Sequence, residues 1–419
     1  MDHFTLRDGQ LHCEDAPLAD IAEEVGTPVY VYSRATLVRH ARVLKEALAD
    51  LDEPLIAYAL KANPNPAVLA VLAAEGLGGD IVSIGEYRQA RMAGMSTDAI
   101  LFSGVGKTAD EMAEALAGGL RQFNLESVEE ARTLSAVAHA MGHEAPVALR
   151  INPDVEAGTH AKITTGTAEN KFGIPAAEAL AAFRAVRDLP ALKVTGITVH
   201  IGSQLTSLAP LETAFRRLGE LIAALRQDGF VLELADLGGG LGVPYGAGQP
   251  EPPTPHEYGA MVARVTDGWG LRLAFEPGRL ISGNAGVLLT RVVRVKPGES
   301  HPWLIVDAAM NDLMRPALYD AYHQIDAVRP SGQRMTAHVV GPVCESGDTF
   351  AMAREIDAVG DGDLIIFRTA GAYGAAMSSG YNSRPLTPEV LVDGDRWALV
   401  RRRIDLAEAS AMPLPDWLR

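Results

Sequence analysis

Short apolar runs alternate with longer stretches rich in Ala, Leu, Glu and Arg between about residue 55 and residue 280. The runs have the length of β-strands, and the stretches between them have the composition of helices. Eight such strand–helix units in roughly 225 residues are typical of a (β/α)8 barrel, an α/β fold. A doubly wound open sheet has the same pattern, and the pattern alone does not separate the two. The predicted strands are 55–60, 80–83, 100–103, 122–125, 147–151, 196–200, 232–237 and 271–275, with helices at 66–75, 85–93, 108–117, 128–141, 175–187 and 208–228.

The pattern changes after about residue 283, where apolar runs follow one another without helical stretches between them. The last two runs are joined by Asp393-Gly394-Asp395-Arg396, which is typical of a hairpin turn. We therefore expect a C-terminal, mainly antiparallel β domain, to which the run 29–32 is a candidate for one more strand. Its predicted strands are 287–295, 303–306, 337–343, 364–368, 390–392 and 397–402. The expected division is a barrel at 36–282 and a β domain formed by 1–35 with 283–419.

The composition of the chain limits the kinds of partner that it can be expected to bind. With 37 Lys and Arg against 53 Asp and Glu, the 419-residue chain has a net charge of −16, which argues against nucleic acid and anionic membranes as partners. Its two cysteines, Cys13 and Cys344, lie far apart and fit no metal-ligand spacing. So few cysteines favour a reducing compartment, and the sequence contains no recognisable signal peptide or membrane-spanning run. We expect a cytoplasmic protein without a metal.

A barrel places its chemistry at the carboxyl ends of its strands, so the residues after each apolar run are the candidates. Lys61 directly follows the first run. Burial lowers the pKa of a lysine and makes it a better nucleophile toward an aldehyde. Position alone nevertheless favours a lysine that ends a strand and points into water. Other polar residues at predicted strand ends are Ser83, Ser103, Asn124, Arg150 with Asn152, His200 with Ser203, the glycines 238–240, and Glu276 with Arg279.

Two segments follow the seventh and eighth predicted strands. The segment 237–242 reads Leu-Gly-Gly-Gly-Leu-Gly, and glycines allow backbone N–H groups to approach a phosphate closely. Taken alone, such a run is as consistent with a flexible turn. Glu276-Pro277-Gly278-Arg279 offers a carboxylate for a protonated pyridine nitrogen and a guanidinium for a substrate carboxylate, with a surface ion pair as the alternative.

Six motifs in a fixed order carry more information than any one of them. They are Tyr58-Ala-Leu-Lys61-Ala-Asn63, His200-Ile-Gly-Ser203-Gln204, Gly238-Gly-Gly240, Glu276-Pro-Gly-Arg279, Gly341-Pro-Val-Cys344-Glu345-Ser-Gly-Asp348 and Ala370-Gly-Ala-Tyr373-Gly. The set resembles the alanine-racemase-like barrel enzymes that use pyridoxal phosphate. It is most similar to the diaminopimelate decarboxylase family, over about residues 30–403.

The resemblance implies a pyridoxal 5'-phosphate cofactor, held by Lys61 as a Schiff base, with His200 stacked on its ring. It implies that Cys344 is the acid that protonates the carbon after carbon dioxide leaves, whereas a free cysteine is more often a small buried hydrophobe. A homodimer with shared active sites is implied as well, with Cys344 and Glu345 supplied across the interface. The other implied cofactor contacts are Ser203, Gly239, Gly240, Gly278 and Arg279 at the phosphate, Glu276 at the pyridine nitrogen, and Tyr373.

The segment from Met310 to His323 favours this family over the ornithine and arginine decarboxylases. By resemblance, Arg315 and Tyr319, with Arg279, would hold the distal carboxylate of the substrate. The same comparison gives the distal ammonium to Glu345 and a substrate contact to Tyr373. The implied reaction removes carbon dioxide from the D-centre of meso-2,6-diaminopimelate and gives L-lysine, the last step of lysine biosynthesis.

Two alternatives stay open at this point. The first is a decarboxylase for ornithine, arginine or another polyamine precursor, which the additional arginine disfavours because it would repel a distal amine. The second is a catalytically silent homologue that regulates a true decarboxylase, although such a protein is expected to lack Lys61 or Cys344.

Two features lack an assignment. Ile84 stands where the family usually has Gly, from which we expect a local loop difference without loss of function. The loop 158–167 resembles the substrate-covering loop of the family, and Asn170-Lys171-Phe172-Gly173 after it has no assigned role.

Overall fold

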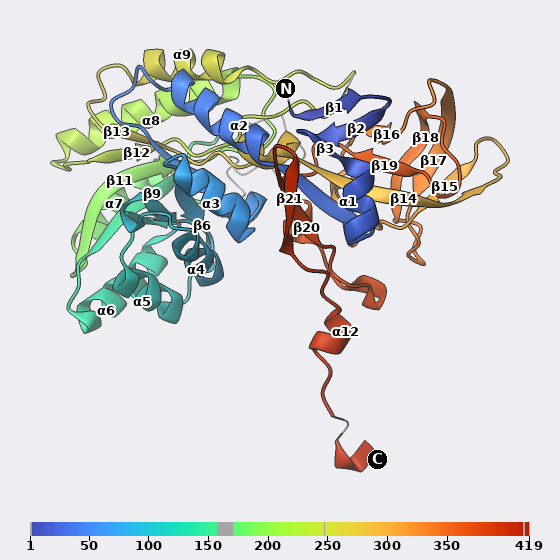
Figure 1. The fold of residues 1–419 in the computed structure, drawn as a ribbon. Helices are drawn as coiled ribbons and strands as arrows, with labels where there is room; N and C mark the ends of the chain where they lie inside the picture. The colour runs from blue at the N-terminus through green and yellow to red at the C-terminus, as the bar shows by residue number, and fades with distance from the viewer. Residues whose placement is uncertain (1, 157–170, 247, 414, 419) are drawn as a thin grey trace. The chain divides into compact units, whose positions relative to one another are not determined.

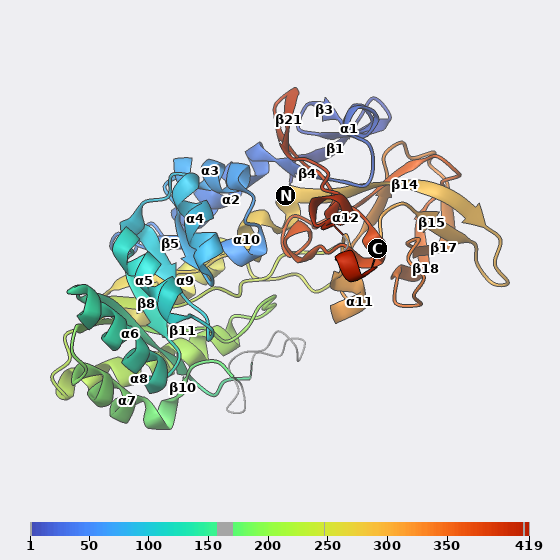
Figure 2. The same cartoon turned by 90° about the horizontal axis from the view of Figure 1, so that it is seen from below.

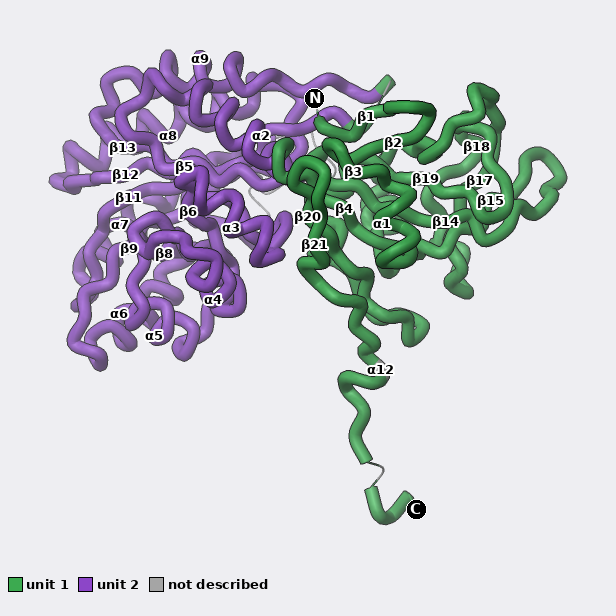
Figure 3. Tube along the Cα trace, viewed as in Figure 1, with its two compact units in different colours: residues 1–36, 245–248, 283–419 green, residues 37–244, 249–282 purple. Residues whose placement is uncertain are grey.

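A computed structural model describes residues 2–156, 171–246, 248–413 and 415–418. The chain divides into two compact units, which Figure 3 shows in different colours. The barrel unit consists of 37–244 with 249–282, and the β unit of 1–36 with 245–248 and 283–419. The loop predicted at 158–167 lies outside the described residues. Among the residues that are described, no helix combines the length and the apolar character needed to cross a membrane.

Parallel strands form a closed barrel in the barrel unit, with helices around the outside (Figures 1 and 2). Closure is made by β13 and β5, which pair with Ala274 opposite Leu55. This pairing rules out the open doubly wound sheet and confirms the predicted barrel. The order around the barrel is β5 (Leu55–Ala59), β6 (Gly78–Ile81), β7 (Ile100–Phe102), β8 (Gln122–Leu125), β9 (Ala145–Asn152), β11 (Leu192–Val199), β12 (Leu234–Asp236) and β13 (Arg272–Phe275), with the short β10 (Ile174–Pro175) beside β9.

Local signals explain where the barrel strands and helices begin and end. β5 is buried at all five positions, as expected of a strand covered on both faces. The side chains of Ser83 and Ser127 accept hydrogen bonds from Glu86 N and Glu130 N, so each caps a helix two residues after a strand ends. The helices are α2 (Arg34–Ala47), α3 (Pro66–Ala74), α4 (Ile84–Met92), α5 (Ala109–Gly118), α6 (Val128–Met141), α7 (Ala179–Arg187), α8 (Ala209–Gln227), α9 (Pro255–Thr266) and α10 (Arg279–Ser282).

The β unit is a mainly antiparallel sheet with a small N-terminal hairpin sheet. The candidate strand at 29–32 is present as β4 (Val29–Ser33), which pairs antiparallel with β14 and parallel with β20. A core of buried apolar side chains from the hairpin, α1, β4, β14 and β20 holds this unit together. Its elements are β1 (Phe4–Arg7), β2 (Gln10–Cys13), β3 (Ala16–Pro17), α1 (Leu18–Val25), β14 (Gly286–Lys296), β15 (Trp303–Val306), α11 (Arg315–Tyr319), β16 (Ile325–Ala327), β17 (Arg334–Val340), β18 (Thr349–Asp357), β19 (Leu364–Phe367), β20 (Glu389–Asp393), β21 (Arg396–Arg401) and α12 (Leu406–Ala409).

Candidate active site

Lys61 lies at the carboxyl end of β5, in a short 3₁₀ turn spanning Leu60–Ala62. Its Nζ is 2.9 Å from Oδ2 of Asp80, the third residue of β6. The Lys61 side chain is 38% exposed, whereas the Asp80 side chain is completely buried. The ammonium is therefore directed toward a buried acid at the mouth of the barrel and does not simply extend into water.

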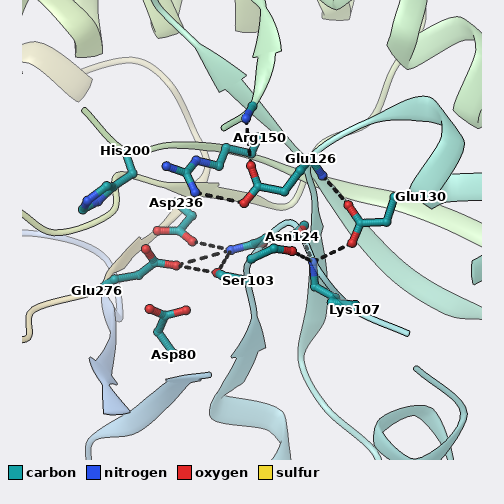
Figure 4. A network of polar contacts seen from close by, with 12 residues as sticks. Asp80, Ser103, Lys107, Asn124, Glu126, Glu130, Arg150, His200, Asp236 and Glu276 are labelled. Carbon is teal, nitrogen blue, oxygen red and sulfur yellow. Dashed lines mark hydrogen bonds and ion pairs between the residues drawn. The ribbon is translucent and has the colours of Figure 1, made fainter. Parts of the chain in front are cut away.

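Asp80 belongs to a cluster of three buried carboxyl groups, which we call the acid cluster: Asp80, Asp236 and Glu276. Asp236 ends β12 and Glu276 follows β13, and their side chains share a hydrogen bond. Asn124 Nδ2 donates to Asp236 Oδ2 at 3.0 Å and to Glu276 Oε1 at 3.3 Å, as Figure 4 shows. Four strand ends thus meet at one point, as a barrel requires.

Burial raises the pKa of Glu276 well above its usual range, and the negative charges of Asp236 and Asp80 raise it further. Lys61 opposes that shift. Burial also raises the pKa of Asp236. The shared hydrogen bond and the shifted pKa values mean that the Asp236–Glu276 pair retains a proton where isolated carboxyl groups would lose it. Such a pair is suited to a cationic ring nitrogen, because a nearby positive charge would offset the free energy that ionising both acids costs.

His200 follows β11 and faces the glycine segment after β12. Its Nδ1 accepts a hydrogen bond from Gly239 N at 3.2 Å, so the ring proton lies on Nε2. Burial lowers the pKa of the imidazole well below its usual value, and the nearby charges of Arg150 and Lys61 lower it further. The imidazole is therefore neutral, with a defined tautomer.

The glycine segment requires glycine because other backbone lies against it. A Cβ on Gly239 would lie 2.2 Å from the carbonyl oxygen of Glu276, and a Cβ on Gly240 would lie 2.5 Å from that of Gly202. Gly240 also has φ +115°, which side chains rarely adopt. The segments after β11, β12 and β13 are therefore packed backbone to backbone.

Ser203 and Arg279 extend the same region. Arg279 Nη2 donates to Ser203 Oγ at 3.1 Å, which joins the segment after β11 to the first residue of α10. Gly278 immediately precedes Arg279. The residues predicted to contact a phosphate thus lie on adjacent segments of one barrel edge.

These features test whether the barrel unit fits pyridoxal phosphate. Asp80 Oδ1 is buried and has no hydrogen-bond partner among the residues that the structure describes. An acid-rich centre with an unsatisfied oxygen suits a cationic ring, and a hydroxyl, a guanidinium and closely packed glycines suit a phosphate. The residues present fit the cofactor.

The predicted substrate residue Arg315 is buried in the β unit, at the start of α11. Its Nη1 donates to His323 Nε2 at 3.0 Å, and His323 Nδ1 donates to the carbonyl of Arg368 at 2.8 Å. The guanidinium also lies 4.8 Å from the centre of the Tyr245 ring. These contacts fix the orientation of the Arg315 guanidinium. Tyr319 ends the same helix.

Cys344 and Glu345 lie in the loop between β17 and β18, and Cys344 is exposed. Asp348 holds this loop: Oδ1 accepts from Met310 N at 2.6 Å, and Oδ2 accepts from Val343 N at 2.7 Å. A Cβ on Gly341 would lie 2.3 Å from Asp348 Oδ2, so this position also requires glycine. The two outer residues of the Gly341–Asp348 motif therefore form the base of the cysteine loop.

Tyr373 lies in the β unit, in the segment after β19, with φ +56°. This left-handed conformation is uncommon for a bulky residue and marks a constrained backbone. The predicted site residues thus fall into two sets. The barrel unit contains Lys61, His200, Ser203, Gly239, Gly240, Glu276, Gly278 and Arg279, and the β unit contains Arg315, Tyr319, Cys344, Glu345 and Tyr373.

Sequence reasoning missed the buried acids Asp80 and Asp236. Each ends or nearly ends an otherwise apolar strand, at Gly78-Gly-Asp80-Ile81 and Leu234-Ala-Asp236. An acid inside a strand that is buried on both faces is itself a signal, because such a group needs a partner. The pattern does not show which partner that is.

The closed barrel with a lysine, an acid pair and closely packed glycines at its mouth is the architecture of a pyridoxal-phosphate-dependent enzyme. Residues 34–283 match the family model of the pyridoxal binding domain of pyridoxal-dependent decarboxylases. The chain belongs to the diaminopimelate decarboxylase family within this class, as the sequence resemblance predicted.

Relatives and solved structures establish this membership. The chain is 55% identical to a diaminopimelate decarboxylase of Zymomonas mobilis over 402 residues, which cover 96% of each protein. It is similar to the crystal structure of diaminopimelate decarboxylase from M. jannaschii in complex with L-lysine, with a TM-score of 0.94, 33% identity and 98% of each chain covered. The Helicobacter pylori enzyme complexed with L-lysine matches with a TM-score of 0.89 and 37% identity, covering 93% of this chain and 98% of that one.

Proposed function

We propose that this chain decarboxylates meso-2,6-diaminopimelate at its D-centre and releases L-lysine and carbon dioxide, the last step of lysine biosynthesis. The observation that carries the proposal is the Lys61–Asp80 contact of 2.9 Å beside the Asp236–Glu276 pair. The identity to diaminopimelate decarboxylases and the L-lysine in two of the similar structures support the substrate.

Pyridoxal 5'-phosphate, when bound, supplies an electron sink for the bond that breaks. Lys61 would hold it covalently through Nζ, and Asp80 orients that nitrogen. Glu276 would face the pyridine nitrogen and share its proton with Asp236. His200, neutral and hydrogen-bonded through Nδ1 to Gly239 N, would present a flat uncharged face to the ring.

The phosphate would be bound by Ser203 with the backbone of Gly239, Gly240 and Gly278, next to Arg279. Rigid packing of these segments against Glu276 supports the assignment, because fixed donors lose no freedom when an anion binds. Tyr373 would contact both cofactor and substrate.

The distal end of the substrate carries a carboxylate and an amine. We assign the carboxylate to Arg279, Arg315 and Tyr319, and the amine to Glu345. The fixed guanidinium of Arg315, held by His323, supports this assignment over ornithine, whose single distal amine a cation would repel.

Cys344 would return a proton to the carbon that has lost carbon dioxide, a role open to an exposed thiol that can donate its proton. We propose that the active unit is a homodimer in which Cys344 and Glu345 serve the site of the other subunit. The exposed position of Cys344 supports this arrangement. The two cysteines are free, which supports a cytoplasmic location.

Steady-state assays with meso-diaminopimelate and ornithine test the substrate. We expect turnover of the first only. Arg315→Met should lower kcat/KM for diaminopimelate by roughly tenfold to a hundredfold, since it removes a charged hydrogen bond. Arg396→Met, an exposed arginine of the β20–β21 hairpin, is the matched control and should leave the rate unchanged. Turnover of ornithine but not diaminopimelate would contradict the proposal.

Borohydride reduction followed by mass spectrometry tests the attachment site. A pyridoxyl adduct is expected on Lys61, and an adduct on another lysine would overturn the assignment. Purified protein that takes up no cofactor and releases no carbon dioxide would instead indicate the silent regulatory homologue.

A further inference from the structure

A second polar network lies beside the acid cluster in the barrel unit, and Figure 4 shows both. It begins at Lys107, whose ammonium is fully buried and donates to the Gly104 carbonyl at 2.6 Å and to the Asn124 carbonyl at 2.8 Å. The third contact of Lys107 is Glu130 Oε1 at 2.6 Å. The other oxygen of Glu130 accepts from Glu126 N at 2.7 Å. This chain of contacts fixes the backbone that carries Glu126.

The carboxylate of Glu126 joins two segments that are distant in sequence. Oε1 accepts from Arg150 Nη1 at 2.9 Å, and Oε2 accepts from Gly173 N at 2.8 Å. Gly173 has φ +73°, and a Cβ there would lie 3.1 Å from Asn152 N, so the segment lies closely against β9. Each oxygen of Glu126 therefore has a defined partner.

Arg150 is held on a second side by an aromatic ring. Its guanidinium carbon lies 4.9 Å from the centre of the Phe172 ring, within the range of a cation–π contact. Arg150 is buried, and Figure 4 shows its guanidinium between Glu126 and His200. Phe172 and Gly173 belong to the Lys-Phe-Gly segment whose role the sequence left unassigned.

We propose that Glu126 is a positioning residue which, with Phe172 and Gly173, fixes the Arg150 guanidinium on the side of the site where His200 would face the cofactor. The inference rests on the proposed function for its catalytic meaning. It also gives the Lys171–Gly173 segment a role. The Phe172 ring contacts the Arg150 guanidinium, and Gly173 N donates to the Glu126 carboxylate that binds it. We call Glu126, Phe172 and Gly173 the Arg150 clamp.

The physical basis is the charge that Arg150 brings to His200. Arg150 from β9 and Lys61 after β5 both disfavour the imidazolium through their charge. Gly239 N donates to Nδ1 and leaves the proton on Nε2. A guanidinium that moves away from His200 removes one of these cations, which makes the imidazole easier to protonate.

Glu126→Gln tests the clamp in the full-length chain. A neutral amide holds a guanidinium less firmly than a carboxylate, so Arg150 gains freedom. Histidine ring signals are followed by NMR against pH in the protein without cofactor, and His200 is assigned from its absence in His200→Gln. We expect His200 to protonate at a higher pH in Glu126→Gln than in the wild type. Loss of the carboxylate charge alone would lower that pH, so a rise reports the displacement of Arg150. In the loaded enzyme, kcat should fall by roughly tenfold to a hundredfold, as misplacement of a site group predicts.

Arg150→Met and the double variant complete the cycle. Arg150→Met should move the His200 titration in the same direction, and adding Glu126→Gln to it should cause no further rise. Glu129→Gln, one turn away on α6 in an exposed pair with Arg132, is the matched control and should change neither readout. An unchanged or lowered His200 titration in Glu126→Gln, or additive shifts in the double variant, would overturn the proposal.

Phe172→Leu keeps the test decisive where Glu126→Gln does not fold. It removes the ring beneath the guanidinium and should raise the pH of His200 protonation by a smaller amount, and no shift would contradict the clamp. Because the titration needs neither cofactor nor substrate, it separates this inference from the proposed function. Wild-type enzyme that fails to turn over diaminopimelate refutes the function alone.

Discussion

The two buried polar groups at the mouth of the barrel differ in one respect, the balance of their charges. The network of Lys107, Glu126, Glu130 and Arg150 pairs two acids with two bases, and each contact is a hydrogen bond of ordinary length. In the described part of the chain, the acid cluster sets three carboxyl groups against the single ion-pair partner Lys61, and Asp80 Oδ1 stays unsatisfied there. The balanced network maintains structure, whereas the unbalanced cluster is completed by a ligand.

Removing the cation that contacts the acid cluster should have the largest effect. Lys61→Met eliminates both the proposed covalent anchor and the partner of Asp80, so turnover of diaminopimelate should be abolished. Carbon dioxide release and the loss of the borohydride adduct measure it. Lys45→Met, which removes a surface lysine of α2 that donates to the Glu75 carbonyl, is the control. Substantial remaining activity would mean that another lysine carries the cofactor.

Breaking the balanced network should reduce stability. Lys107→Met leaves Glu130, whose side chain is only 10% exposed, without its cation, which is expected to cost about 3–5 kcal/mol in the free energy of unfolding. Denaturant unfolding of the protein without cofactor measures the loss. Lys193→Met, which breaks an exposed pair with Glu233, should change the midpoint little. Equal effects of the two variants would contradict a structural role for the balanced network.

Glu276→Gln separates the two roles of the acid cluster. In the loaded enzyme kcat should fall by roughly a hundredfold, since the proposed partner of the ring nitrogen is lost. In the chain without cofactor, the same substitution should be favourable for stability at high pH. Because the pKa of Glu276 is raised on folding, its folded form retains a proton that the unfolded chain loses, and stability falls as pH rises above the usual glutamate range.

Gln cannot titrate, so the stability of Glu276→Gln relative to the wild type should increase from pH 5 to pH 8. Unfolding midpoints at the two pH values provide the measurement. A pH-independent difference would show that Glu276 is already ionised in the folded chain.

Glu86 provides a smaller version of the same test. Its carboxylate accepts from Val82 N at 2.8 Å, and burial raises its pKa to about 7. The folded form holds the proton between the usual pKa and pH 7, so stability from this group is lost as pH rises through that window. The free energy of unfolding of Glu86→Gln should therefore rise by about 2 kcal/mol relative to that of the wild type between pH 5 and pH 8. The pKa of Glu111 is lowered on folding, so Glu111→Gln should show the opposite trend at lower pH, as pH rises toward 5, and little change between pH 5 and pH 8.

The barrel was predictable from sequence because strands such as β5, β7 and β13 are largely apolar runs followed by polar residues. The helices α1, α2 and α9 to α12 and the strands β1 to β3, β10, β16 and β18 were not predicted. β1 is exposed at three of its four positions, and β18 loses its alternation at the bulges in its pairing with β17. Strands of this kind are specified by their neighbours more than by their own pattern.

The candidate site was predictable as a set of residue types and not as a set of contacts. The motifs located Lys61, Glu276 and Cys344, but not Asp80 as the partner of Lys61. Gly341 and Asp348, which form the base of the Cys344 loop, were part of a sequence motif. The motif did not show that Asp348 holds the loop through backbone N–H groups. Ile84 begins α4, and its backbone N donates to Glu111 Oε1 at 3.2 Å, a bond that any residue at that position can make.

The contact between Gly239 and the Glu276 carbonyl has a consequence for the choice of cofactor. The segment assigned to the phosphate and the acid assigned to the ring nitrogen are joined through backbone atoms, with no side chain between them that can adjust. The spacing between the two ends of the cofactor is therefore built into the barrel. Among the forms of vitamin B6, a molecule of another length, or pyridoxal lacking its phosphate, can satisfy only one end at a time.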